Sequence, residues 1–335
     1  MSPRRRSQRA IGIAAAVTLL CGAAISVQVV RAQSSSPASK ASSTAADGEL
    51  GSLLDMSARD RDVAGRSDVR TIGPRVVPAP TSKHPECRLD LGYGVWPIDV
   101  TAARTLTMVT AVAYRDGLSY VKAARAFEHS LQIPGRRPLT PDQARVEVRF
   151  KRLHPVPRTT SLDAVYALFR PHTLTCVTPQ RYMPVQPMLS NGLTLRTLVL
   201  TRGWIDAYGG RSIGGFAPGG ITTGHIPDSA HYDGRAVDIF FPTTDPNNNA
   251  RGWLLANWLA ANADYYQIAN IIFDAMVWSK INQTWGWHPY VYPLGPTTNP
   301  TLMHMDHIHV DVVRGYGPNP NPTPQPGTGV GAAGD

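Results

Sequence analysis

The chain has 335 residues, of which 42% are hydrophobic and 17% are charged, and it contains 29 glycines and 29 prolines. This length suits two domains of ordinary size, or one domain with long appendages. The low content of charged residues excludes a highly charged disordered protein and a coiled coil. The high content of glycine and proline predicts long loops and unstructured tails.

The formal net charge of +9 is concentrated at the start of the chain. Residues 1–32 contain no acidic residue and five arginines, namely Arg4, Arg5, Arg6, Arg9 and Arg31. The remainder has a net charge of only +4. A nucleic acid is therefore not expected as a partner, because no strongly basic surface is left to bind it.

An uncharged and mostly apolar stretch runs from Ile11 to Val30. A cationic start, an apolar centre and a small residue at the end, here Ala32, are typical of a secretory signal peptide. The stretch is also long enough to span a bilayer, so an uncleaved N-terminal anchor that tethers the protein to the membrane is the alternative. Both interpretations place the rest of the chain outside the cytoplasm, either secreted, in the cell wall or anchored to the membrane.

Composition divides the rest of the chain into four segments. Residues 33–80 lack a sustained apolar period and predict a disordered linker, and residues 315–335 predict a disordered tail rich in glycine and proline. Residues 81–187 favour a mainly helical domain of unknown role. Residues 188–314 alternate short apolar runs with Gly, Pro and Asn clusters, which predicts an α+β domain with a small antiparallel sheet and flanking helices.

Hydrophobic spacing predicts the individual elements. In the first domain we expect helices at Thr101–Gly117 and Leu118–Leu131, followed by a strand at Arg145–Phe150 where apolar residues alternate with charges. In the second domain we expect one clear helix and several short apolar segments of the sheet. The helix is expected at Asn249–Ala263, and the apolar segments are Leu198–Leu200, Ala236–Phe241, Ile271–Phe273 and Ile308–Val313.

Two cysteines, Cys87 and Cys176, remain once the signal segment is removed. In an oxidising compartment two cysteines far apart in the sequence most often form a disulfide. The alternative is a pair of buried free thiols. No CxxC motif or adjacent histidine suggests a nucleophile or a metal ligand at either position.

The first motif with chemical content is Ser229–Asp238, which reads SAHYDGRAVD and leads into the apolar run Ile239–Phe241. A histidine in a turn and an aspartate on the following strand can face one point, because Gly234 lets the backbone bend sharply between them. Such a pair can hold a metal ion.

The second motif is His304–Val312, which reads HMDHIHVDV. Its alternation predicts a strand whose Ile308, Val310 and Val312 enter the core, while His307, His309 and Asp311 share the opposite face. One carboxylate and several imidazoles at these spacings suit Zn²⁺ bound by three protein ligands with an open fourth position, which favours catalysis over a structural role.

The first motif matches the S-x-H-x-x-G-x-A-x-D signature of the zinc D-alanyl-D-alanine metallopeptidases. This superfamily also includes lysostaphin-type endopeptidases and the hedgehog signalling domain, and the sequence DHIH resembles its closing histidine motif. The resemblance covers about Gly192–Arg314. It implies that His231, Asp238 and His309 ligate the zinc.

The resemblance offers two candidates for the catalytic base. His307 stands where some members carry a second, non-ligating histidine, and Asp306 stands where others carry a glutamate. Strand parity places His307 on the face of His309, so we favour His307 as the base. Asp306 is then expected to orient the His307 imidazole or, if the strand begins with a bend, to act as the base itself.

These peptidases also use an arginine upstream of the signature to hold the substrate carbonyl or carboxylate. Arg202 and Arg211 lie in the right interval, but neither has the usual S-G-Y-R context. We expect Arg211, in a glycine-rich loop, to take this role.

The resemblance implies a zinc-dependent peptidase that cuts the stem peptides of peptidoglycan, as a carboxypeptidase or an endopeptidase. The alternative is a non-catalytic module that binds the cell wall or has a structural role and retains the zinc-peptidase scaffold. A third possibility places the activity in the helical half. There Thr107–Gln132 resembles the helical region of secreted actinobacterial wall proteins related to lytic transglycosylases. That family's Gln-Glu-Ser ending is replaced by Glu128-His129-Ser130, so we expect a docking domain.

Overall fold

The computed structural model describes residues 86–150, 159–179 and 181–318. All of them belong to one compact unit. The predicted signal segment, the predicted linker and all but the first residues of the predicted tail lie outside the described residues. Within the described ranges, no helix has the length and hydropathy needed to cross a membrane.

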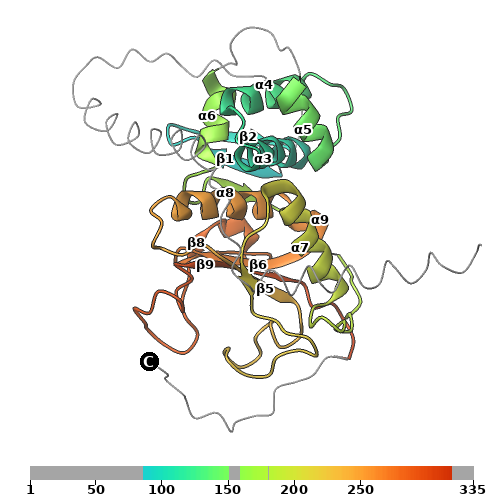
Figure 1. Cartoon of the computed structure of the whole chain (residues 1–335), viewed down its shortest axis with the longest axis vertical. Helices are drawn as coiled ribbons and strands as arrows, with labels where there is room; N and C mark the ends of the chain where they lie inside the picture. Colours follow the sequence, from blue (N-terminus) through green and yellow to red (C-terminus); the bar gives the residue numbers. More distant parts are fainter. Residues whose placement is uncertain (1–85, 151–158, 180, 319–335) are drawn as a thin grey trace, which may run out of the picture. The chain divides into compact units, whose positions relative to one another are not determined.

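The first half of the described chain combines four helices with a small antiparallel sheet whose strand order is β2-β1-β3 (Figure 1). The helices are α3 (Val100–Arg115), α4 (Tyr120–Leu131), α5 (Pro141–Phe150) and α6 (Thr159–Ala167). The strands are β1 (Cys87–Asp90), β2 (Val95–Ile98) and β3 (Leu174–Cys176). The two helices predicted at Thr101–Gly117 and Leu118–Leu131 are confirmed as α3 and α4.

The strand predicted at Arg145–Phe150 is wrong, because these residues form the end of helix α5. Thr140 and Gln143 bond reciprocally, each side chain accepting from the other's backbone N–H at 3.3 and 3.0 Å, which is a capping box at the helix start. Pro141 takes the first helical position, where a missing N–H costs nothing. Ala144 and Val148, which are four residues apart, are both buried, as on one face of a helix. The helical spacing of these residues therefore decides the structure, and not the alternation that is typical of a strand.

The disulfide between Cys87 and Cys176 is confirmed. The two cysteines are direct partners in the antiparallel pairing of β1 with β3. The bond therefore joins the beginning of the first half to its last strand and encloses helices α3 to α6.

The second half is built on a six-stranded antiparallel sheet with the order β4-β5-β9-β6-β7-β8 (Figure 1). The strands are β4 (Ile213–Gly214), β5 (Ala236–Phe240), β6 (Ile268–Phe273), β7 (Met276–Ser279), β8 (His288–Pro289) and β9 (His307–Val312). The helices are α7 (Leu195–Tyr208), α8 (Asn248–Ala261) and α9 (Ala263–Tyr266), with a 3₁₀ turn η1 (Gln283–Trp285). The α+β fold class with a small antiparallel sheet and flanking helices is confirmed.

The apolar run Leu198–Leu200 is not part of the sheet and lies inside helix α7. The helix begins at Thr194, whose side chain accepts a hydrogen bond from the backbone N–H of Thr197. Leu200 is buried while Val199 is exposed, so the run spans two faces of the helix. Three apolar residues are too few to distinguish the helical period from the strand period.

Strand β9 separates two environments in the way that its alternation predicts. Ile308, Val310 and Val312 have no exposed surface and belong to the hydrophobic core. Helix α8, whose Trp253 and Trp258 are buried, packs against β6 and β9 and covers one face of the sheet. The histidines of β9 consequently lie on the side of the sheet that α8 does not cover.

The two halves share one hydrophobic core. The fully buried Asn257 of α8 accepts a hydrogen bond from the backbone N–H of Leu174 in β3 (3.0 Å) and donates one to the carbonyl of Leu168 (2.9 Å). Trp287 donates its indole N–H to the carbonyl of Leu174. The domain boundary near residue 187 stays a prediction.

Candidate metal centre

The two central strands of the large sheet bring a carboxylate and an imidazole together. Strands β5 and β9 pair antiparallel, and Asp238 lies directly opposite His309 in their register. The Asp238 Oδ1 atom lies 3.2 Å from His309 Nδ1. Both residues are buried. Because they lie on paired strands, the backbone hydrogen bonds of the sheet fix their positions relative to each other.

His231 reaches the same point from the turn that precedes β5. Gly234 closes this turn with a φ of 66°, and its N–H donates to the carbonyl of His231. The ring nitrogen Nδ1 of His231 donates to the carbonyl of Gly215 at 2.7 Å. Gly215 follows β4 and cannot be replaced without conflict, because a Cβ atom there would lie 2.4 Å from that same nitrogen.

Three potential ligand atoms converge in this arrangement. His231 Nε2 lies 3.0 Å from His309 Nδ1 and 3.2 Å from Asp238 Oδ1, which itself lies 3.2 Å from His309 Nδ1. A tetrahedral zinc ion bound at about 2.0–2.2 Å requires neighbouring ligand atoms about 3.3–3.6 Å apart. The observed triangle is only slightly smaller than this, so its atoms fit such an ion with little movement.

The hydrogen bonds on the far side of each ring fix where the lone pairs point. The Gly215 carbonyl can only accept, so His231 Nδ1 carries a proton and Nε2 of a neutral ring has a lone pair. His309 Nε2 donates to Asp311 Oδ2 at 3.3 Å, which leaves the lone pair of its neutral ring on Nδ1. Two nitrogen lone pairs and a carboxylate oxygen then face one another, which is the arrangement of donor atoms that a bound cation requires.

The close approach of these side chains shifts the pKa of Asp238 and of His309. Burial on its own would raise the pKa of Asp238, but hydrogen bonds with His231 and His309 hold it well below its usual range. Burial would likewise lower the pKa of His309, but its hydrogen bonds to Asp238 and Asp311 outweigh this and raise it to about 9. In the metal-free chain a proton on His309 thus supplies the cation, and a metal ion would replace it.

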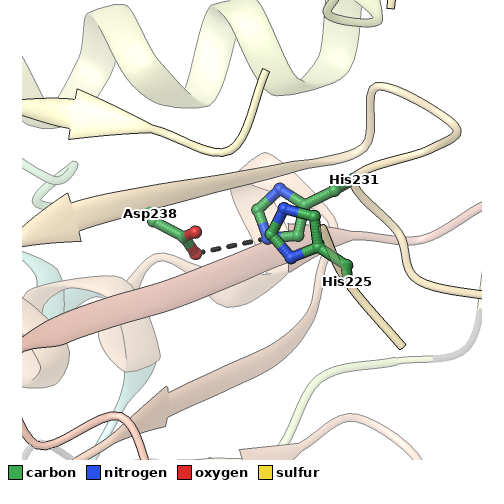
Figure 2. A group of neighbouring side chains, drawn as sticks. All are labelled: His225, His231 and Asp238. Carbon is green, nitrogen blue, oxygen red and sulfur yellow. Dashed lines mark ion pairs between the residues drawn. The ribbon is translucent and has the colours of Figure 1, made fainter. Parts of the chain in front are cut away.

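A third histidine joins this group, and the sequence did not predict it as a ligand. His225, His231 and Asp238 each offer a ligand atom, and these atoms lie within 4.8 Å of one another (Figure 2). The rings of His225 and His231 stack with their centroids 4.0 Å apart. Burial, followed by the electrostatic influence of the neighbouring His231, lowers the pKa of His225 to about 4, so it is neutral and able to ligate at neutral pH.

Tyr232 holds His225 in this position. Its hydroxyl accepts from the backbone N–H of His225 at 3.0 Å and donates to the carbonyl of the same residue at 2.7 Å. Tyr232 is buried and directly follows the ligand candidate His231. The only sequence signal for His225 was a further histidine six residues before His231, which is weak because loop conformation decides where such a side chain points.

His307 and Asp306 form a pair at the edge of the cluster. His307 Nδ1 donates to Asp306 Oδ1 at 2.7 Å, and His307 Nε2 lies 3.9 Å from Asp238 Oδ1. Asp306 also accepts from the Thr301 hydroxyl at 2.8 Å. Burial acts to raise the pKa of Asp306, but these two hydrogen bonds keep it below its usual range. Asp306 therefore fixes the tautomer that leaves a lone pair on His307 Nε2.

His304 begins the second motif, and the sequence alone does not indicate a role for it. Its ring centroid lies 4.8 Å from that of His307 and 5.7 Å from that of His309. Burial, followed by the electrostatic influence of the neighbouring His309 and His307, lowers the pKa of His304 to about 3. His304 therefore stays neutral and forms an uncharged wall of the cluster.

The structure places Arg211 in a different environment. Its guanidinium donates to the Tyr114 hydroxyl at 2.7 Å and lies over the rings of Phe241 and Tyr208. Phe241 and Tyr208 belong to the hydrophobic core, whereas the ligand candidates lie on the opposite face of the sheet. Through these contacts Arg211 connects helix α3 to Phe241, which directly follows β5. The other candidate, Arg202, is exposed on α7.

Comparison with known proteins adds one match. The family model described as VldE, C-terminal domain, matches residues 190–301. The matched range includes His225, His231 and Asp238 and ends before Asp306. No curated protein and no solved structure matches the chain.

Proposed function

We propose that the chain is a zinc-dependent peptidase that acts outside the cytoplasm on the stem peptides of peptidoglycan, as a carboxypeptidase or an endopeptidase. The observation that carries this proposal is the triangle of His231 Nε2, Asp238 Oδ1 and His309 Nδ1, with sides of 3.0 to 3.2 Å. The substrate class rests on the resemblance of residues 229–238 to the D-alanyl-D-alanine metallopeptidase signature.

Zinc suits the donor set better than other common divalent ions. Two imidazole nitrogens and one carboxylate oxygen are typical ligands of catalytic zinc, whereas Mg²⁺ and Ca²⁺ prefer oxygen ligands alone. When bound in such a site, zinc polarises the scissile carbonyl and lowers the pKa of a water molecule. The Gly215 carbonyl would orient the His231 ring by accepting from its Nδ1, and Asp311 would orient the His309 ring by accepting from its Nε2.

His307 would act as the general base. Its Nε2 carries the lone pair because Nδ1 donates to Asp306, and this nitrogen faces the cluster 3.9 Å from Asp238 Oδ1. It would take a proton from the attacking water and return it to the leaving amine. Asp306 would stabilise the imidazolium that forms in between. Because the contacts of Arg211 lie with the core, we assign no step to this residue.

The second candidate function is a non-catalytic module that binds the cell wall or has a structural role, and the position of His225 favours it. A structural zinc site has four protein ligands, while a catalytic site keeps one position open. If His225 took the fourth position beside His231, Asp238 and His309, no place would remain for a water molecule. A His225→Ala variant separates the two candidates, because it would weaken metal binding strongly only in a closed site.

The test is the release of products from purified muropeptides by zinc-loaded protein, followed by mass spectrometry. We expect turnover by the wild type, none above background by His307→Ala, and equal zinc content in both. His288→Ala, which changes a histidine on the separate strand β8, is the matched control and should keep its activity. The peptidase proposal fails if the zinc-loaded wild type releases nothing while a related active enzyme does so in the same assay.

A further inference from the structure

A large aromatic side chain is left exposed in the turn that joins β7 to β8. Trp285, the last residue of η1, is 69% exposed, although all four tryptophans at positions 204, 253, 258 and 278 are completely buried. An exposed indole forgoes the free energy that burying its large apolar surface would contribute. The Trp285 ring contacts the imidazole of His288, with the two centroids 5.5 Å apart, and the rest of the indole is accessible to a ligand.

The turn that carries Trp285 is held firmly in place. The side-chain amide of Gln283 accepts from the backbone N–H and the hydroxyl of Thr178 at 2.6 and 2.9 Å, and it donates to the carbonyl of Thr178 at 2.9 Å. Trp287, two residues after Trp285, donates its indole N–H to Leu174 in β3 at 2.9 Å. Trp285 is therefore presented on a rigid turn, which lowers the entropic cost of binding a ligand.

Beside Trp285 lies a pocket of about 170 Å³. The disulfide-linked sheet contributes Arg88, Asp90 and Thr175 of β1 and β3 and Val95 of β2, and the lining is completed by His172, Thr173 and Thr284. Gly286 also lines the pocket, and a Cβ atom there would lie 3.1 Å from the Thr175 hydroxyl. A larger residue than glycine would therefore fill part of the space.

The lining of this pocket offers both apolar and polar surface, and no single charge dominates it. Arg88 and Asp90 contribute one positive and one negative group, and the threonines contribute hydroxyls that donate and accept. Among the described residues, neither the Arg88 guanidinium nor the Thr175 hydroxyl forms a hydrogen bond with another residue. These groups are therefore available to a ligand that has both donors and acceptors.

We propose that this pocket binds one ring of a neutral saccharide. A pyranose ring has one face of C–H groups, which packs against an indole, and an edge of hydroxyls, which requires paired donors and acceptors. An anionic ligand would need an excess of positive charge over the single Arg88, and a wholly apolar ligand would leave the Arg88 guanidinium and the threonine hydroxyls without partners. The site lies apart from the histidine cluster and does not depend on its activity.

Ligand-observed NMR with the neutral trisaccharides N,N′,N″-triacetylchitotriose and cellotriose, each at millimolar concentration, tests the proposal. We expect saturation transfer to at least one of them with the wild type, a roughly tenfold weaker affinity in Trp285→Ala, and retention of binding in Trp285→Tyr. Tyr265→Ala, which removes another exposed aromatic ring on α9, is the matched control and should bind as the wild type does.

Binding to only one of the two trisaccharides identifies which ring substituents the pocket accepts. No transfer from either trisaccharide, or equal transfer with Trp285→Ala, overturns the proposal. Since Trp285 is exposed, its replacement leaves the core intact, and circular dichroism and zinc content should match those of the wild type. A failure here is thus distinguishable from a failure of the peptidase proposal.

Discussion

Asp238 and His309 are direct cross-strand partners on β5 and β9, with Asp238 Oδ1 3.2 Å from His309 Nδ1. Their side chains share one face of the sheet because the side-chain period of a strand is two. A slip of one residue in this pairing would turn either side chain to the opposite face. The register of the two central strands, rather than any loop, therefore determines the geometry of this half of the metal centre.

The approach of Gly215 to His231 gives the first prediction. In Gly215→Ala the new Cβ atom would lie 2.3 Å from His231 Cε1, so the ring must move and lose its hydrogen bond to the Gly215 carbonyl. We expect zinc affinity to fall by about 10–100-fold, the usual effect of losing such an orienting contact. Competition with a chromophoric chelator measures this affinity.

Gly219 offers a matched control for the same substitution. Gly215 and Gly219 both have a φ of 80°, so alanine brings similar backbone strain to each, but nothing lies within 4 Å of a Cβ atom at Gly219. We expect Gly219→Ala to keep the zinc affinity of the wild type. An equal loss in both variants would mean that backbone strain, and not the contact with His231, is responsible.

Asn257 provides a prediction about the packing of the two halves. Asn257→Ala would leave the N–H of Leu174 and the carbonyl of Leu168 buried without their partner. We expect a loss of about 2–4 kcal/mol in the free energy of unfolding, measured by urea denaturation. Asn249→Ala changes an exposed residue of the same helix and should stay within about 0.5 kcal/mol of the wild type. Equal stabilities of the two variants would contradict this role.

The disulfide should contribute strongly to stability because Cys87 and Cys176 are separated by 89 residues. On the chain-entropy model, closing a loop of this length stabilises the fold by about 4–5 kcal/mol. Reduction with dithiothreitol should therefore lower the melting temperature of the wild type markedly. The Cys87→Ala/Cys176→Ala double variant should melt at the lower temperature with or without reductant, and any further shift on reduction would argue against this explanation.

Sequence reasoning performed best where a local pattern determines the structure. The alternation of His307–Val312 correctly predicted which side chains of β9 enter the core. Successive side chains of a strand point to opposite faces of the sheet, so the apolar residues face the core and the others face the site. It failed at Arg145–Phe150, where a capping box at Thr140 and Gln143 determined the conformation. The capping residues lie just outside the alternating segment, so the alternation alone does not reveal the helix.

The remaining features depend on contacts that are distant in the sequence. His225 joins the cluster because Tyr232 holds its backbone, and Arg211 faces the core because Tyr114, from the other half of the chain, accepts its hydrogen bond. Neither contact leaves a periodic or compositional signal. The positions of loop residues therefore required the folded structure, while those on the central strands did not.

The central claim, a metal ion held by His231, Asp238 and His309, is tested most directly by metal analysis of the purified full-length chain. After incubation with zinc and removal of excess ion, inductively coupled plasma mass spectrometry should find one zinc per chain in the wild type and in His288→Ala. His309→Ala should have lost it, with circular dichroism unchanged. Equal zinc in His309→Ala and the wild type, or no zinc in the wild type, would contradict the claim.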